Sequence, residues 1–149
     1  IFCVFDWETV LGNKTRMENH KVFIELIDAE ISSGAVILCP SMPSIEYWFL
    51  LHFEDYRGFL RDYGAAANRL APYLKSCFVD QDKPLKKLLK MEKYLKDSTW
   101  VENLCADGKL TAAVNRAEKN ITAAMEAGKL DDQSYSYVYR VFKNKMDKE

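Results

Sequence analysis

Several features that mark particular classes of protein are missing from this sequence. No apolar run approaches the roughly 20 residues that a membrane-spanning helix needs, and no secretory signal pattern precedes the first predicted element. The four cysteines lie far apart without a CxxC motif, and there are only two histidines. A disulfide framework, a zinc site and a histidine-rich metal centre are therefore disfavoured. We expect a cytoplasmic protein with reduced thiols and no membrane association.

What the chain does contain is typical of a single globular domain. Its 149 residues are enough to close one core, and 48% of them are hydrophobic and 29% charged. Residues 1–56 carry nine acidic and three basic side chains, whereas residues 57–149 carry thirteen and eighteen. An acidic front part beside a basic remainder suits a metal-dependent site next to an anion-binding surface. Uneven surface charge without any function gives the same count.

The first third of the chain has the pattern of a parallel α/β unit. The run IFCVF at 1–5 predicts a buried strand, and the polar residues 10–20 predict a loop. Residues 21–33 have the apolar spacing of a helix. A second buried strand is predicted at 35–39 and is closed by Pro40. Strand, helix and strand within about forty residues are typical of a right-handed crossover between parallel strands.

Two parallel strands do not make a stable sheet alone, and no third strand is predicted downstream. The chain also opens within its first strand rather than at a methionine. We therefore expect an α/β protein with a parallel-sheet core whose further strands precede Ile1, followed by a mostly helical part. Residues 1–56 are assigned to the α/β portion and residues 57–149 to the helical portion of one domain.

Beyond Ser44 the pattern is helical almost to the end of the chain. Helices are predicted from Ile45 onward, over 64–77 with a kink or break near Pro72, from Pro84 into 85–96, and over 98–106, 109–127 and 133–146.

Two carboxylates follow the first predicted strand directly, in the sequence FDWET. Asp6 and Glu8 lie at the carboxyl end of that strand, which is the edge where open parallel sheets bind ligands. Their i, i+2 spacing on extended backbone lets both side chains project in one direction. Such paired oxygens suit Mg²⁺, which takes one or two protein carboxylates and completes its shell with water and phosphate. A solvated turn with a helix-capping acid explains the same spacing about equally well.

A proline-containing turn and an apolar helix follow the second strand, in CPSMPSIEYWFLLHFEDY. Ser44 is placed to cap this helix, and Glu46 falls in its first turn, where a carboxylate interacts well with the helix dipole. Helical spacing puts Glu46 at the head of an apolar stripe near the strand ends. His52 lies about 120° away around the helix, so the two do not form a dyad on one face. A packed, hydrogen-bonded histidine is the commoner role for such a residue.

A lysine-rich face is the third candidate site. The segment 83–96 contains six lysines and one glutamate, which is enough positive charge to attract a phosphate backbone. The lysines that we assign to a nucleic-acid-binding surface are Lys83, Lys86, Lys87, Lys90 and Lys93. A solvated face of an amphipathic helix is at least as common an explanation.

The run SMPSIEYWFLLHFEDY closely resembles the central motif of the RloB-like proteins, a prolyl turn followed by an aromatic residue, Glu, Trp and a Leu-Leu-His-Phe segment. VFDWET is similar to the acidic motif that follows a strand in that family, with Glu8 where Asp is more usual. TAAVNRAEKN and QSYSYVYRVF resemble the late helices of the family. The resemblance covers nearly the whole chain.

This resemblance implies a Toprim-like fold and a place among bacterial restriction and phage-defence systems. In Toprim nucleases and topoisomerases, a glutamate after an early strand and an Asp-x-Asp pair after a later strand bind Mg²⁺ beside a phosphodiester. By this resemblance Asp6 and Glu8 would be the acidic pair, and the early glutamate would lie upstream of Ile1. Glu46 and His52 would be additions of the family at the same edge.

We therefore predict a nuclease that depends on Mg²⁺ or Mn²⁺ and cleaves DNA or RNA. Asp6 and Glu8 would hold the metal, Glu46 would orient the attacking water, and His52 would contact the phosphate or protonate the leaving oxygen. An ATPase or a restriction-modification subunit would be a further partner. The competing hypothesis is a non-catalytic sensor or partner-binding module, which Glu8 favours because its longer side chain moves the second oxygen ligand outward.

Overall fold

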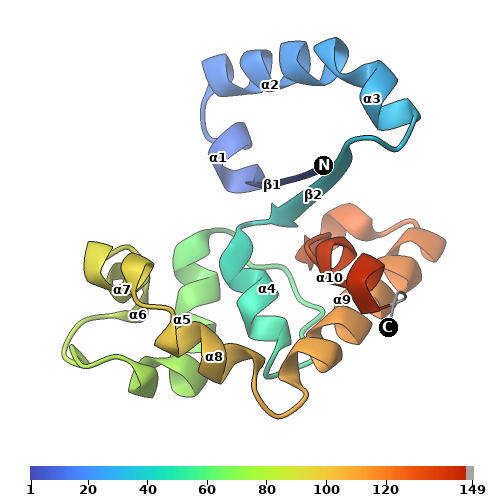
Figure 1. Cartoon of the computed structure of the whole chain (residues 1–149). Coiled ribbons are helices and arrows are strands. Elements are labelled where there is room, and N and C mark those ends of the chain that lie inside the picture. The colour runs from blue at the N-terminus through green and yellow to red at the C-terminus, as the bar shows by residue number, and fades with distance from the viewer. Residues whose placement is uncertain (147–149) are drawn as a thin grey trace.

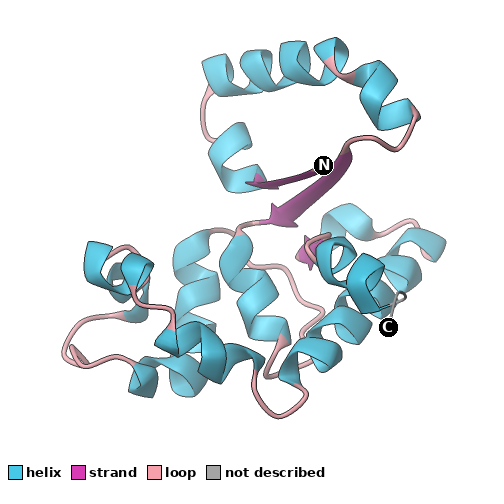
Figure 2. Ribbon diagram, in the orientation of Figure 1, coloured by secondary structure: helices cyan, strands magenta, loops and turns pink. Residues whose placement is uncertain are grey.

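The computed structural model describes residues 1–146, with side chains described as far as residue 143 (Figure 1). Helices dominate, and the strands are few and short (Figure 2). The elements in chain order are β1 (Phe2–Asp6), α1 (Trp7–Leu11), α2 (Lys14–Leu26), α3 (Asp28–Ser32), β2 (Ile37–Met42), α4 (Ile45–Leu51), α5 (Tyr63–Leu74), η1 (Lys75–Cys77), α6 (Leu85–Leu88), α7 (Glu92–Lys96), α8 (Thr99–Cys105), α9 (Lys109–Glu126), η2 (Leu130–Asp132), β3 (Tyr135–Ser136) and α10 (Tyr139–Met146).

The strands form one mixed sheet in the order β1–β2–β3. β1 and β2 are parallel over their whole length, from the pair Phe2 and Ile37 to the pair Asp6 and Ser41. The chain between them passes through α1, α2 and α3. The α/β class and the parallel pair that the sequence predicted are therefore confirmed.

A third strand does exist downstream, so the prediction that none follows was wrong. β3 pairs antiparallel with β2, with Ser136 opposite Ser41 and their hydroxyl oxygens 2.8 Å apart. The helix predicted over 133–146 begins only at Tyr139. Residues 134–137 alternate serine and tyrosine, which is the two-residue period of a strand and was read as part of a helix.

β2 also runs further than predicted, because it continues through Pro40 to Met42 instead of ending at Pro40. Proline has no amide hydrogen to give to a neighbouring strand, but its carbonyl oxygen can still accept one. The Pro40 carbonyl accepts a hydrogen bond from the Tyr137 N–H at 2.8 Å. The longer strand carries the chain to the turn that precedes α4.

Residues 10–20, predicted as a loop, are mostly helical. α1 ends at Leu11, and Asn13 caps α2 by accepting a hydrogen bond from the Arg16 N–H at 3.2 Å. The polar composition misled because none of the residues of α2 is buried, so the helix has little need of an apolar face. The helix predicted over 21–33 is broken at Ile27, where α2 gives way to α3.

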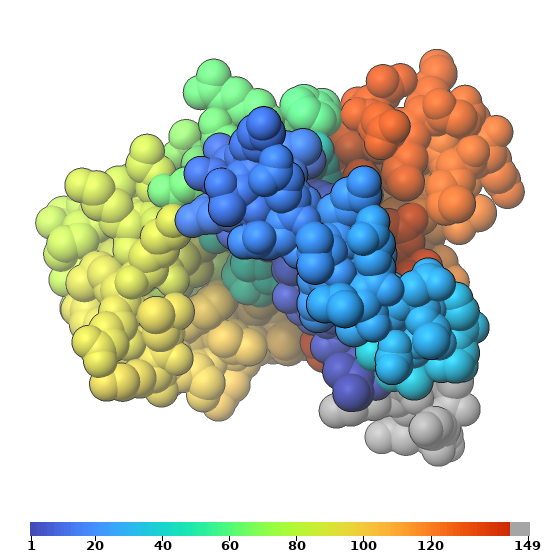
Figure 3. All heavy atoms as spheres, turned by 90° about the horizontal axis from the view of Figure 1, so that it is seen from above, coloured from blue at the N-terminus to red at the C-terminus, as the bar shows by residue number. Residues whose placement is uncertain are grey.

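The hydrophobic core lies in the helical part of the molecule and is centred on α4 (Figure 1). Tyr47, Leu50 and Leu51 of α4 have no exposed surface, and they pack among residues of α5, α6, α8 and α9. Among residues 1–38, all of which the structure describes, none is buried. Seen from above, this front unit lies across the helical part, with α1 on the side of the α5–α6 segment (Figure 3).

The segment 83–96 is two short helices and not one. α6 ends at Leu88, and Met91 has extended backbone before α7 begins at Glu92. Leu88 of α6 is fully buried, whereas in α7 Tyr94 is buried and Leu95 is 69% exposed. No helix within the described residues is both long enough and apolar enough to cross a membrane.

Candidate functional site

Three predicted carboxylates line one cleft. Two of them, Asp6 and Glu8, follow the first strand, and Glu46 lies in the helix after the second strand. Asp6 comes from the end of β1, Glu8 from α1 and Glu46 from the first turn of α4. The cleft has a volume of about 220 Å³ and is lined by Asp6, Glu8, Thr9, Arg16, Ser44, Glu46, Tyr63 and Lys90. We call it the acidic cleft. It lies at the carboxyl end of the parallel strands, as the sequence predicted.

Asp6 connects β1 to the beginning of α4. Its Oδ1 accepts a hydrogen bond from the backbone N–H of Ile45 at 2.8 Å. Ser44 occupies the N-cap position, but its side chain makes no capping hydrogen bond. The Ser44 hydroxyl instead donates to Glu46 Oε2 at 2.5 Å. The prediction that Ser44 caps this helix with its side chain was therefore wrong, and a carboxylate from a neighbouring strand takes that role.

Glu8 makes a matching connection to α5. Its Oε2 accepts a hydrogen bond from the backbone N–H of Tyr63, the first residue of α5, at 2.6 Å. Asp62, the N-cap residue, accepts from the Ala65 N–H at 2.7 Å. A carboxylate at a helix N-terminus is favoured by the helix dipole. The helix-capping role that the sequence left open for this acidic pair is therefore present in the structure.

Each carboxylate of the acidic cleft keeps a second oxygen. Within the described part of the chain, no hydrogen bond reaches Asp6 Oδ2, Glu8 Oε1 or Glu46 Oε1. Carboxylate oxygens are the hard ligands that Mg²⁺ prefers. No group of three or more His, Cys, Asp or Glu side chains among the described residues is already arranged around a metal position. The donor set fits Mg²⁺ in kind, as a pair of carboxylates with water or phosphate completing the shell.

The electrostatics of the cleft raise the pKa of Asp6 to about 6. Burial is the largest cause, and the charge of Glu46 and then that of Glu8 add to it. The hydrogen bond from Ile45 and the charge of Lys90 oppose the increase. A bound cation would favour the ionised form and lower this pKa again. Asp6 is thus the carboxyl group of the cleft whose charge responds to a cation or to pH near neutrality.

His52 lies away from the acidic cleft. It follows the last residue of α4, and six residues of helix separate it from Glu46 by about 9 Å along the axis. Its side chain is 2% exposed, and its Nδ1 lies 3.0 Å from the Trp48 carbonyl oxygen. Burial lowers the pKa of His52, which favours the neutral ring. The separation of Glu46 and His52 agrees with the helical spacing, and the structure does not bring His52 to the strand ends.

Two of the five predicted lysines are already paired. Lys83 Nζ lies 3.3 Å from Asp80 Oδ1, and Lys93 forms an ion pair with the other oxygen of Asp80. The pKa of Asp80 is held well below its usual range, mainly by the hydrogen bond from Lys93 and then by that from the Tyr94 hydroxyl. These two lysines therefore stabilise the turn before α6 and the start of α7.

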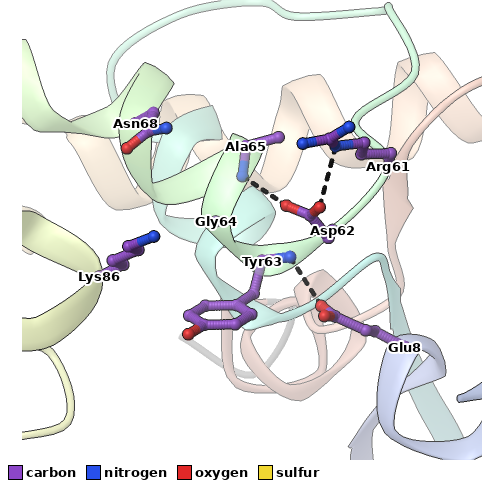
Figure 4. Close-up of a pocket in the computed structure, with 8 residues that line it drawn as sticks. All are labelled: Glu8, Arg61, Asp62, Tyr63, Gly64, Ala65, Asn68 and Lys86. Atoms are coloured by element: carbon purple, nitrogen blue, oxygen red, sulfur yellow. Dashed lines mark hydrogen bonds and ion pairs between the residues drawn. The ribbon is translucent and has the colours of Figure 1, made fainter.

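The other three predicted lysines are exposed, and two of them lie next to the carboxylates. Lys90 lines the acidic cleft, with its ammonium 3.9 Å from the centre of the Tyr63 ring. Lys86 lines a second pocket of about 310 Å³ beside it (Figure 4). Lys87 lines neither pocket.

We call the second pocket the Lys86 pocket. Its lining residues are Glu8, Arg61, Asp62, Tyr63, Gly64, Ala65, Asn68 and Lys86. Sequence reasoning missed Arg61, Tyr63 and Asn68. The sequence predicted only a helix over 64–77 in this region, and nothing local relates that helix to a strand end more than fifty residues earlier.

Together the fold and the site define a largely helical α/β protein with a carboxylate cleft at the end of a parallel strand pair. The family model described as RloB-like protein matches residues 1–144, and the chain therefore belongs to the RloB-like protein family. This confirms the resemblance seen around Glu46 and across the late helices. Comparisons with curated proteins and with solved structures gave no match.

Proposed function

We propose that this RloB-like protein is a divalent-metal-dependent nuclease of a bacterial defence system, with a Toprim-like acidic site. The observation that carries the proposal is the acidic cleft, where three carboxylates from β1, α1 and α4 each retain an oxygen without a hydrogen bond from the described residues. The raised pKa of Asp6 supports it, because crowded carboxyl groups of this kind are typical of sites that bind a cation.

Asp6 and Glu8 would hold Mg²⁺ or Mn²⁺. When bound, the ion would polarise a phosphoryl oxygen and lower the pKa of an attacking water. The hydrogen bonds from Ile45 and Tyr63 fix one oxygen of each carboxylate and thereby orient the other. A site built this way is preorganised before the substrate arrives.

Glu46 is the candidate general base. The Ser44 hydroxyl fixes one of its oxygens, and the other is left to accept a proton from water. Lys90 and Arg16 line the same cleft and would offset the charge of the phosphate. The proposal gives His52 a packing role against Trp48 and no proton transfer, since its ring is buried beyond the far end of α4.

A cleavage assay tests this proposal. The full-length protein should cut plasmid, single-stranded DNA or tRNA with Mg²⁺ or Mn²⁺ and lose activity in a chelator. Asp6→Asn keeps an acceptor for the Ile45 N–H and should reduce kcat by 100-fold or more, and Glu46→Gln by about 100-fold. Glu92→Gln, a change at an exposed carboxylate outside the cleft, is the control. Cleavage at the normal rate by Asp6→Asn would exclude the metal assignment.

One observation favours a non-catalytic sensor or partner-binding module instead. Asp6 and Glu8 already have a structural role, because each accepts a hydrogen bond from the first residue of a helix. A module of this kind would bind an ATPase or a restriction-modification subunit. It would show no metal-dependent cleavage of any of these nucleic acids and no change in thermal stability on addition of Mn²⁺. The nuclease predicts the opposite result in both measurements.

A further inference from the structure

The acidic cleft and the Lys86 pocket share a wall. Glu8 and Tyr63 line both, so the two cavities adjoin across these side chains. Figure 4 shows Lys86 pointing from α6 toward the start of α5, with the Tyr63 ring between Lys86 and Glu8. A ligand that fills one cavity would reach the other without leaving the surface.

One segment places a cation in each cavity. Lys86 and Lys90 are four residues apart, and the first lines the Lys86 pocket while the second lines the acidic cleft. Leu85 and Leu88 between and beside them are buried in the core, which holds the segment against α5. The backbone that carries the two ammonium groups is therefore fixed before any ligand binds.

The charge available in the Lys86 pocket belongs to side chains and not to the helix terminus. The first N–H group of α5, from Tyr63, is bound by Glu8, and that of Ala65 is bound by Asp62. Arg61 contacts the same Asp62 carboxylate, with Nε 3.0 Å from Oδ2. One oxygen of Glu8 and both oxygens of Asp62 are thus engaged, whereas Lys86 has no ion pair or hydrogen bond with a described residue.

Gly64, near the start of α5, lies close to the Asp62 carboxylate and beside Lys86. A Cβ atom placed on Gly64 would lie 4.0 Å from Lys86 Cδ and 3.2 Å from Asp62 Oδ1. The second distance is shorter than an ordinary van der Waals contact, so a side chain at this position would press on the Asp62 carboxylate that caps α5. Asn68, one turn further along α5, adds an amide that can donate a hydrogen bond.

We infer that the Lys86 pocket binds the phosphate next to the one being cleaved, so that the substrate is a polynucleotide strand and not a free nucleotide. This inference rests on the proposed nuclease function. Lys86 and Arg61 contact the neighbouring phosphate, Asn68 donates a hydrogen bond to it, and the strand crosses the shared wall at Tyr63. The scissile phosphate occupies the acidic cleft beside Lys90.

Binding measurements separate this subsite from the lysine-rich surface in general. The probe is a fluorescein-labelled single-stranded oligonucleotide, as DNA and as RNA, bound to the full-length protein in a chelator that prevents cleavage. Lys86→Ala should weaken binding roughly tenfold, the value of one charge-assisted hydrogen bond, and should reduce the slope of log K against log salt by about 0.7. Lys96→Ala, from the same segment but outside both cavities, should change neither quantity.

Kinetics then separate the subsite from catalysis. With Mg²⁺ present, Lys86→Ala should raise KM with kcat within about twofold of normal, because the lost contact is made equally in the ground and transition states. Asp6→Asn should lower kcat and leave oligonucleotide binding intact. On an oligonucleotide with one uncharged methylphosphonate next to the scissile linkage, Lys86→Ala and the unchanged protein should have the same KM.

The outcomes distinguish the two proposals. If the protein cleaves but Lys86→Ala and Lys96→Ala behave alike, the subsite is overturned and the nuclease stands. If Lys86→Ala selectively weakens binding but no protein cleaves, phosphate binding in the Lys86 pocket is supported, whereas the nuclease is overturned together with the place of the pocket beside a scissile phosphate. If the protein binds no oligonucleotide, the subsite is overturned together with the nuclease.

Discussion

The front unit, residues 1–38, and the helical part that follows are built on different principles. In the helical part Tyr47, Leu50 and Leu70 have no exposed surface. In the front unit no residue is buried, and Leu26 is 75% exposed. Since buried apolar surface supplies most of the free energy of folding, the helical part carries the stability of the molecule. The front unit contributes two of the three carboxylates of the acidic cleft, Asp6 and Glu8.

The two regions are joined by polar contacts as well as by the sheet. Asp6 and Glu8 accept hydrogen bonds from Ile45 and Tyr63, and the Glu8 N–H donates to the Pro43 carbonyl oxygen at 3.0 Å. The groups proposed to hold a metal therefore also fix the position of the front unit on the helices. Position and chemistry depend on the same two side chains.

The largest effect should come from a change in the helical core. Leu70→Ala removes a fully buried side chain of α5 and should lower the free energy of unfolding by about 2–5 kcal/mol. The matched change in the front unit, Leu26→Ala, should cost less than about 0.5 kcal/mol because that side chain is exposed. Urea unfolding measures both. Equal costs would show that the front unit has a core of its own.

A smaller effect should follow from breaking one of the polar contacts. Glu8→Ala removes the acceptor of the Tyr63 N–H and should cost about 1 kcal/mol, the usual value of a helix-capping side chain. Glu8→Gln keeps an acceptor oxygen and should cost only a few tenths. Hydrogen exchange of the Tyr63 amide is the direct measurement. Faster exchange in the alanine variant alone is expected, and unchanged exchange in both would mean that the contact does not hold α5.

An effect no larger than that of Glu8→Ala should be the pH dependence that Asp6 confers. The pKa of Asp6 is about 6 in the folded protein and 3.8 in an unperturbed aspartate, so the folded state binds the proton more tightly than the unfolded state does. Stability from this group is fully present below pH 3.8 and is lost as pH rises through about 6.

Asp6→Asn isolates that contribution because it does not titrate. It should become more stable than the unchanged protein between pH 4 and pH 7, by about 1 kcal/mol, since the half-buried carboxylate keeps part of its hydration. Urea unfolding at several pH values measures the difference. A difference that does not change with pH would show that the Asp6 carboxyl has an ordinary pKa.

Local patterns in the sequence were enough to predict the parallel strand pair and the acidic residues at its edge. Two continuous apolar runs on either side of a helical pattern identify β1 and β2. Because the two strands are parallel, their carboxyl ends meet at one edge of the sheet, where a site is expected. Helical spacing also separated Glu46 from His52 correctly. These predictions depend only on residues close together in the chain.

The features that were missed depend on distant residues. Asp6 replaces Ser44 as the acceptor at α4 because β1 ends beside that helix, which no local pattern reveals. The lysines of 83–96 have helical spacing, but Asp80 binds Lys83 and Lys93, and the break at Met91 divides the segment into two short helices. Lys86 lies near the carboxylates because α6 packs against α5, and Glu8 accepts a hydrogen bond from Tyr63, the first residue of α5.

Binding of Mn²⁺, followed by electron paramagnetic resonance, tests the acidic cleft most directly. We predict that the full-length protein binds Mn²⁺, that Asp6→Asn weakens this binding at least tenfold, and that Glu92→Gln leaves it unchanged. Equal Mn²⁺ binding by Asp6→Asn and Glu92→Gln, or none by the unchanged protein, would contradict the assignment of the acidic cleft as a metal site.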